Sequence, residues 1–86
     1  MPTISEFYGI TIRMFYNDHA PPHFHAEYGE YELIIGISPI TVMEGKVPRR
    51  VKSMVLEWTA LHQAELQENW NRCRQAQSLE SIEPLD

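Results

Sequence analysis

The sequence lacks the features of membrane and secreted proteins. Cys73 is the single cysteine, so no disulfide forms within the chain, and the reducing cytoplasm is the expected compartment. No apolar run approaches the roughly 20 residues that a membrane span needs, and the first residues do not resemble a secretory signal. We therefore expect one domain without a membrane partner, since 86 residues suit a single core.

Basic residues are also few. The chain has 7 Lys and Arg against 12 Asp and Glu, which gives a formal net charge of -5. This balance argues against broad, sequence-independent binding of nucleic acid, which depends on many basic contacts to phosphate. The deficit lies in residues 1–44, where Arg13 is the one base. Most of the other bases form a group that we name the basic cluster: Lys46, Arg49, Arg50 and Lys52.

Alternating apolar residues predict strands in the first half of the chain. Residues 8–16 alternate without a break, which is typical of one half-buried strand. Pro21 and Pro22 then indicate a loop. Residues 23–28 and 31–37 predict a hairpin, because only Gly29 and Glu30 separate them. A short further strand is expected over residues 40–43.

The apolar period changes to about 3.6 residues after Pro48. We expect one amphipathic helix within residues 47–77, with a bend near His62, and an extended tail over residues 78–86. The apolar stripe of this helix consists of Val51, Val55, Trp58, His62, Leu66, Asn69 and Cys73. The predicted fold is thus a single α+β domain over residues 1–86, in which residues 1–44 form a three- to four-stranded antiparallel sheet covered by one long C-terminal helix.

Three of the four histidines fall within the short segment from His19 to His25. Residues two apart on a strand point the same way, so His23 and His25 are expected to project side by side. They can serve as ligands of a transition metal such as zinc, as a general acid and base, or as polar residues on a wet sheet face. The proline pair favours a functional role, because a stiff loop holds adjacent side chains with less entropy to lose.

His62 and Trp70 each allow two interpretations. Strict alternation turns His23 and His25 away from the helix that carries His62, so a joint site needs a bulge or an edge position. Otherwise His62 is a core histidine whose ring bonds a backbone carbonyl or Asp18. Trp70 lies off the helix stripe, and we expect it either to anchor the interface of a homo-oligomer or to pack against the tail.

The basic cluster conflicts with local electrostatics, because a helix N-terminus favours acidic residues. Cations at this position predict a compensating anion. The candidates are a phosphate, an acidic partner protein, and the chain's own Glu27, Glu30 and Glu32. Cys73 has neither a paired cysteine nor an activating base, and we interpret it as a packing residue.

Several short motifs carry a family resemblance. They are Phe7-Tyr8-Gly9-Ile10, Asp18-His19, Pro21-Pro22-His23-Phe24-His25-Ala26, Pro48-Arg49-Arg50, Glu57-Trp58, Leu61-His62, Asn69-Trp70 and Ile82-Glu83-Pro84-Leu85. With them the chain resembles a family of small bacterial proteins known as domain of unknown function four-one-six-zero. The resemblance implies that His23, His25, His62 and Trp70 are recurrent motif residues. It also implies a small partner protein encoded nearby, because members look like halves of toxin-antitoxin-like gene pairs.

The leading hypothesis is a cytoplasmic bacterial protein that acts through a protein partner in a toxin-antitoxin-like module. If RNA is its substrate, His23, His25 and His62 are the catalytic candidates, and Arg49 or Arg50 would hold the phosphate without a metal. Two alternatives stay open. One is a noncatalytic partner-binding module whose histidines are structural, with Lys46, Arg49, Arg50 and Trp70 as the binding residues. The other is a metal-binding protein that uses His23 and His25, with His62 or His19 as further ligands.

Overall fold

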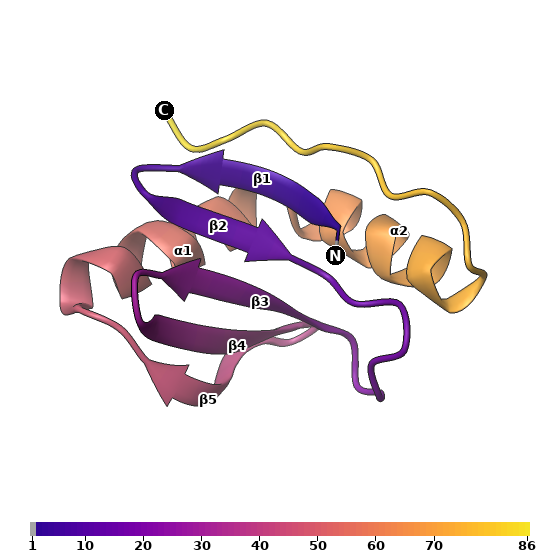
Figure 1. Cartoon of the computed structure of the whole chain (residues 1–86), viewed down its shortest axis with the longest axis horizontal. Helices are drawn as coiled ribbons and strands as arrows, with labels where there is room; N and C mark the ends of the chain where they lie inside the picture. Colours follow the sequence, from indigo (N-terminus) through magenta and orange to yellow (C-terminus); the bar gives the residue numbers. More distant parts are fainter. Residues whose placement is uncertain (1) are drawn as a thin grey trace.

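The sheet is an antiparallel meander in which the strands pair in the order of the chain. The computed structural model describes residues 2–86, and its five-stranded sheet has the order β1-β2-β3-β4-β5. The strands are β1 (Thr3–Phe7), β2 (Ile10–Arg13), β3 (His23–Tyr28), β4 (Tyr31–Ile37) and β5 (Ile40–Lys46). Two helices, α1 (Arg49–Leu61) and α2 (Gln63–Arg74), cover one face of this sheet (Figure 1). The α+β class and the antiparallel sheet are therefore confirmed.

The prediction of three or four strands is wrong, because an unpredicted strand, β1, precedes the others, and only Ile10–Arg13 of residues 8–16 form a strand. Tyr8 and Gly9 adopt positive φ angles of 50° and 79°, and they form a tight turn between β1 and β2. Turns with positive φ at both central residues suit the twist of a hairpin. The alternation that was predicted does hold within β2, where Ile10 and Ile12 are fully buried beneath the helices.

The prediction of one helix over residues 47–77 is also wrong. His62 has φ -123° and ψ 25°, so the chain leaves helical geometry there, at the position where the sequence predicted a bend. Hydrogen bonds continue across the junction, with Leu66 N–H donating to His62 O at 2.9 Å. The Gln63 side chain donates to Ile37 O at the end of β4, at 2.7 Å, and this bond ties the start of α2 to the sheet.

The core lies between the helices and the inner face of the sheet. Trp58 on α1 is fully buried, with its ring 5.4 Å from Phe7 and 5.9 Å from Phe24. The predicted stripe faces this core, and only His62 among its members is half-buried rather than buried. Burial of this apolar face is the main stabilising term for helices of such modest length.

Residues 78–86 contain no helix or strand and run as an extended segment along β1 (Figure 1). Ile82 is 4% exposed, and its backbone N–H donates to Ile4 O at 2.8 Å. The Trp58 indole donates to Glu83 O at 2.8 Å, and the Asn69 side chain exchanges two hydrogen bonds with the Glu80 backbone, both at 2.9 Å. The tail is therefore part of the packed structure. Among residues 2–86, no helix is long and apolar enough to cross a membrane.

Candidate metal centre

The loop between β2 and β3 brings an aspartate over the first two histidines of β3. His23 and His25 stand two residues apart on β3, so they project from the same face of the sheet. The loop that precedes them is held at its end, where Ile37 N–H donates to Pro22 O at 3.1 Å. Asp18, in the middle of the loop, then reaches both imidazoles.

Three side chains converge on one point. The Nε2 atoms of His23 and His25 each lie 3.0 Å from the same oxygen, Oδ2 of Asp18. One ligand atom from each of these residues falls within 4.8 Å of the other two. His23 is buried and the other two are half-buried, so the cluster lies at the surface but is shielded from bulk water. The prediction that His23 and His25 lie side by side is confirmed.

The other ring nitrogens also face oxygen acceptors. Nδ1 of His23 lies 2.8 Å from Pro21 O, and Nδ1 of His25 lies 3.0 Å from Glu32 Oε2. A neutral imidazole carries one N–H donor and one lone pair, whereas carbonyl and carboxylate oxygens only accept. A neutral His23 that donates to Pro21 therefore turns the lone pair of Nε2 toward the Asp18 carboxylate.

The same proton count applies to His25, because both of its nitrogens face carboxylates. A neutral His25 sets a lone pair against one carboxylate oxygen, and a neutral His23 sets a lone pair against either Pro21 O or Asp18 Oδ2, so each ring has one repulsive contact. The repulsion is relieved by positive charge at the point of convergence. That charge is either an extra proton on each ring or one cation bound between Asp18 and the two Nε2 atoms.

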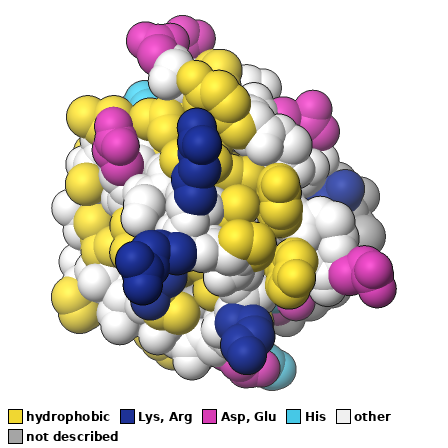
Figure 2. Space-filling model, turned by 90° about the vertical axis from the view of Figure 1, so that its left-hand side faces the viewer, with side chains coloured by type: hydrophobic (Ala, Val, Ile, Leu, Met, Phe, Trp, Pro, Cys, Tyr) yellow, Lys and Arg dark blue, Asp and Glu magenta, His cyan; other side chains and the backbone are white. Residues whose placement is uncertain are grey.

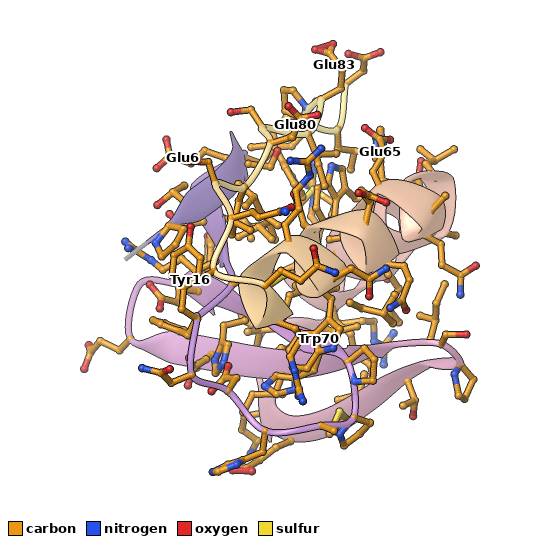
Figure 3. The ribbon with its side chains drawn as sticks, turned by 90° about the vertical axis from the view of Figure 1, so that its right-hand side faces the viewer. Glu6, Tyr16, Glu65, Trp70, Glu80 and Glu83 are labelled. Carbon is orange, nitrogen blue, oxygen red and sulfur yellow. The ribbon has the colours of Figure 1, made fainter. Side chains whose placement is uncertain are left out.

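Aromatic side chains fix the two imidazole planes. The Trp70 ring on α2 lies 5.2 Å from the His23 ring, and Phe15 meets the His25 ring edge-on at 4.6 Å. Trp70 is 4% exposed and points from α2 toward the sheet (Figure 3). The structure thus places Trp70 in the core of this chain, against His23, rather than on a free surface where it could anchor an interface.

A pocket of about 310 Å³ opens beside the three converging side chains. It is bounded on one side by the loop and on the other by β4 and β5. Its other lining residues are His19, Ala20, Pro21, Ile34, Met43 and Glu44. Both His19 and Glu44 are exposed, so they offer an imidazole and a carboxylate near the cluster without a fixed partner in the described chain.

His62 does not join the cluster. Its ring packs 5.4 Å from Trp58, and its Nδ1 lies 2.6 Å from Glu65 Oε1. Asp18, which the sequence suggested as a partner of His62, binds His23 and His25 instead. His62 lies at the junction of α1 and α2, whereas Trp70 and Cys73, farther along α2, are the helix residues next to the cluster.

Lys46 pairs in register with Glu32, the residue that binds His25, but the arginines of the basic cluster lie beyond the end of β5, far from His23. His23 pairs with Gly36, which pairs with Thr41 at the start of β5, whereas Lys46 ends that strand. Five residues of extended strand span roughly 17 Å. Arg49 and Arg50 follow beyond Lys46, so the structure does not bring these arginines to the histidines.

Two members of the site, Asp18 and Glu32, were missed as partners of the histidine pair. The signal for Asp18 was its place in the same loop motif, five residues before His23. Glu32 could have been found from the hairpin register, because Glu27 faces it across the turn and His25 lies two residues before Glu27. Cys73, interpreted as packing, is 4% exposed. Burial raises the pKa of its thiol, and the nearby Asp18 charge raises it further, so Cys73 remains a neutral thiol.

An α+β domain with a histidine and carboxylate cluster at one end of its sheet is the class that this fold and site define. The chain belongs to the family described as Domain of unknown function (DUF4160), whose model matches residues 9–71, more than half of the chain. Neither the comparison with curated proteins nor that with solved structures found a match.

Proposed function

We propose that this protein binds a divalent transition metal ion through Asp18, His23 and His25. The observation that carries the proposal is the convergence of two imidazole Nε2 atoms on one carboxylate oxygen, with the Nδ1 atom of each ring facing an acceptor. A metal ion at this point would use both lone pairs and the carboxylate charge. The Nδ1–H groups would then donate to Pro21 and Glu32.

The geometry is close to what such an ion requires. Ligand atoms about 2.0 to 2.1 Å from a tetrahedral zinc ion lie roughly 3.3 Å from one another. The nitrogen-to-oxygen distances of 3.0 Å would open slightly to admit the ion, and the two nitrogen atoms, which lie within 4.8 Å of each other, would adjust toward the same spacing. Hydrogen bonds from metal-bound histidines to a carbonyl and a carboxylate are the usual second layer of such sites, and Pro21 and Glu32 supply both.

The donor set narrows the class of metal. Two imidazoles with one carboxylate suit zinc, nickel, copper or iron better than the hard cations calcium and magnesium. Three protein ligands leave at least one coordination position, which would face the pocket beside Met43 and Glu44. An open position of this kind is typical of catalytic rather than structural zinc sites. The exposed His19 and Glu44 would be a further ligand or a proton acceptor there.

Metal-independent RNA cleavage receives less support. Such a reaction needs a base and an acid on opposite sides of the scissile phosphate, and both His23 and His25 point their Nε2 atoms at Asp18. Arg49 and Arg50 lie at the far end of the sheet. We retain the toxin-antitoxin-like role and the cytoplasmic location as predictions, and a partner surface is argued separately below.

Titration calorimetry on untagged protein tests the metal proposal. We expect zinc to bind with a dissociation constant of about 1 μM or below, and to bind less well in acid, because protons compete for the ligands. The variants His23→Ala, His25→Ala and Asp18→Asn should each weaken binding by about tenfold or more. His62→Ala is the matched control, since this histidine lies outside the cluster and should bind zinc as the wild type does.

Cobalt gives a second measurement that does not depend on affinity alone. Co²⁺ bound at this site should produce visible absorption bands that disappear in the Asp18→Asn variant and persist in His62→Ala. Zinc should also raise the melting temperature of the wild type, because it binds the folded state alone. A His23→Ala, His25→Ala double variant that binds zinc as tightly as the wild type would sink the proposal.

A further inference from the structure

The strand β5 leaves one edge of the sheet open. Within residues 2–86, β5 pairs with β4 and with no other strand, and no backbone hydrogen bond outside that ladder involves it. An edge strand of this kind presents a row of unpaired N–H and C=O groups. Its seven residues span roughly 23 Å, which is long enough to pair with a short extended peptide.

The side chains of β5 suit contact with another chain. Met43 is 42% exposed, and Thr41, Glu44 and Lys46 are also exposed. The inward members Ile40 and Val42 are half-buried against the core, so they fix the strand in place. β5 is therefore anchored to the core through Ile40 and Val42 and carries exposed apolar and polar groups.

Unpaired positive charge lies at the end of this edge. All four residues of the basic cluster are exposed, and in the described part of the chain none makes an ion pair within 4.0 Å. The first turn of α1 has no acidic residue. In Figure 2, which looks at this end of the molecule, basic side chains lie among hydrophobic ones, and most acidic side chains lie toward the outline.

The chain's own glutamates do not compensate these cations. Glu27 binds Arg13 at 3.1 Å, and Glu32 binds His25 at 3.0 Å. Other acidic side chains, among them Glu65, Glu80 and Glu83, point outward from α2 and the tail (Figure 3). The interpretation in which Glu27, Glu30 and Glu32 neutralise the basic cluster therefore has no ion pair to support it.

We propose that the β5 edge binds an extended acidic segment of another protein by strand addition. The segment's backbone would complete the ladder of β5, and its carboxylates would contact Lys46, Arg49 and Arg50. Strand addition draws affinity from main-chain hydrogen bonds and specificity from side chains on alternate positions. The proposal uses none of Asp18, His23 and His25, the three residues proposed to hold the ion, although Met43 and Glu44 of β5 also line the pocket beside them.

An acidic polypeptide fits the β5 edge better than RNA or a second copy of this chain. RNA cannot complete a backbone ladder, and the net charge of -5 repels a long polyanion from the rest of the surface. A second copy of this chain would offer only Glu44 from its own β5, one carboxylate for four cations. Lys46 alone would suffice to protect an edge from aggregation, so Arg49, Arg50 and Lys52 call for another role.

The test uses a labelled eight-residue peptide of alternating valine and glutamate at low salt. Its binding is measured by fluorescence anisotropy, and the residues that it contacts are found from amide shifts in NMR spectra of the protein. We expect binding that shifts the amides of residues 40–46 and that weakens as salt screens the charges. The same peptide with N-methyl groups on alternate amides, or with lysine in place of glutamate, should bind at least tenfold more weakly.

Charge-reversal variants distinguish an effect of the basic cluster on peptide binding from an effect of the protein's net charge. Arg49→Glu with Arg50→Glu should weaken peptide binding about tenfold or more, while Arg72→Glu with Arg74→Glu, the same change on α2, should leave binding within about twofold. Both proteins must melt cooperatively, and circular dichroism checks this. Equal losses in the two variants would overturn the proposal, because the effect would then be non-specific.

Other occupants give distinct results. A ten-nucleotide RNA that competes with the peptide and binds more tightly would overturn the proposal, because nucleic acid would then be the preferred ligand. A solution mass of two chains at tens of micromolar, with protected β5 amides and no peptide binding, would assign the edge to a second copy. Binding that survives N-methylation of the peptide would also overturn it, because the ladder would then have no part in recognition.

Discussion

The two edges of the sheet are treated in opposite ways. The edge at β1 is covered by residues 78–86, and Ile82 donates a backbone hydrogen bond to Ile4. The edge at β5 has no such cover within the described residues, and it carries the exposed charges Glu44 and Lys46. The sheet therefore has one covered edge and, within the described residues, one open edge, and the open edge is the one for which we propose strand addition.

Covering an edge and blunting an edge also have different energetic consequences. The tail contributes buried apolar area and satisfies the indole of Trp58 and the amide of Asn69, so it is part of the folding free energy. Edge charges on β5 contribute little to stability, because they act against wrong pairing. Changes at the two edges should therefore have different readouts, which the following experiments compare.

Removal of the tail should have the largest effect. A chain that ends at Gln77 loses the buried Ile82 and leaves Trp58 Nε1 and the Asn69 amide without partners. Together these losses amount to about 5 kcal/mol or more, comparable with the whole stability of a small domain. Circular dichroism should show no cooperative melt. A chain that ends at Glu83 keeps these contacts and should melt within a few degrees of wild type.

Gly45→Ala should be the most damaging point change on β5. Gly45 has φ +92°, and a Cβ there would lie 2.1 Å from Glu32 O in β4. We expect a loss of about 3 kcal/mol or more, because both the backbone strain and the clash must be relieved. Gly29→Ala is the matched control, since Gly29 also has positive φ, +58°, but open space around it. It should lose only about 1 to 2 kcal/mol in urea unfolding; equal losses would mean that the clash is relieved by movement of β4.

Asn69→Ala tests the polar contacts of the covered edge. Asn69 is 1% exposed and exchanges hydrogen bonds with both backbone groups of Glu80. We expect a loss of about 2 kcal/mol in urea unfolding. Asn71→Ala, on the exposed side of the same helix, should stay within about 0.5 kcal/mol. A loss no larger than that of Asn71→Ala would show that the tail is held without Asn69.

Neutralising the open edge should change association rather than stability. Glu44→Thr with Lys46→Thr should alter the free energy of unfolding by about 0.5 kcal/mol or less, yet raise the mass seen by light scattering as concentration increases. Glu6→Thr makes a similar change on β1, whose edge is covered, and should leave the protein's mass unchanged. If both variants associate equally, general loss of charge, not the open edge, would be the cause.

Alternation and helical period predicted which faces are buried, but they did not show where elements end: unbroken alternation over residues 8–16 hid the turn at Tyr8 and Gly9. The sequence predicted the β3–β4 hairpin and the buried stripe of the helices, because each element buries one face. It missed β1, where the register shifts between Thr3 and Ser5 and leaves the neighbours Ile4 and Ser5 both buried, so no alternation is visible. The helix break at His62 shows only as a change of backbone angle and has no proline or glycine to mark it.

The candidate site was half predictable for a related reason. Spacing alone placed His23 and His25 on one face, because that inference needs only the geometry of a strand. Asp18 could not be assigned, since its position depends on how the loop folds back over β3. The convergence of Asp18 with both imidazoles depends on the tertiary structure. It is the feature that makes the histidine pair a candidate site.

The hydrogen bond between Ile4 and Ile82 also bears on the order of folding. It joins the two ends of the described chain, so its loop-closure entropy is among the highest of any contact in the fold. Contacts of this kind form late, after local hairpins and helix packing have reduced the search. Weakening the contacts of the tail should therefore accelerate unfolding and leave the folding rate nearly unchanged. Residues 78–86 would then determine how long the native state persists before it unfolds.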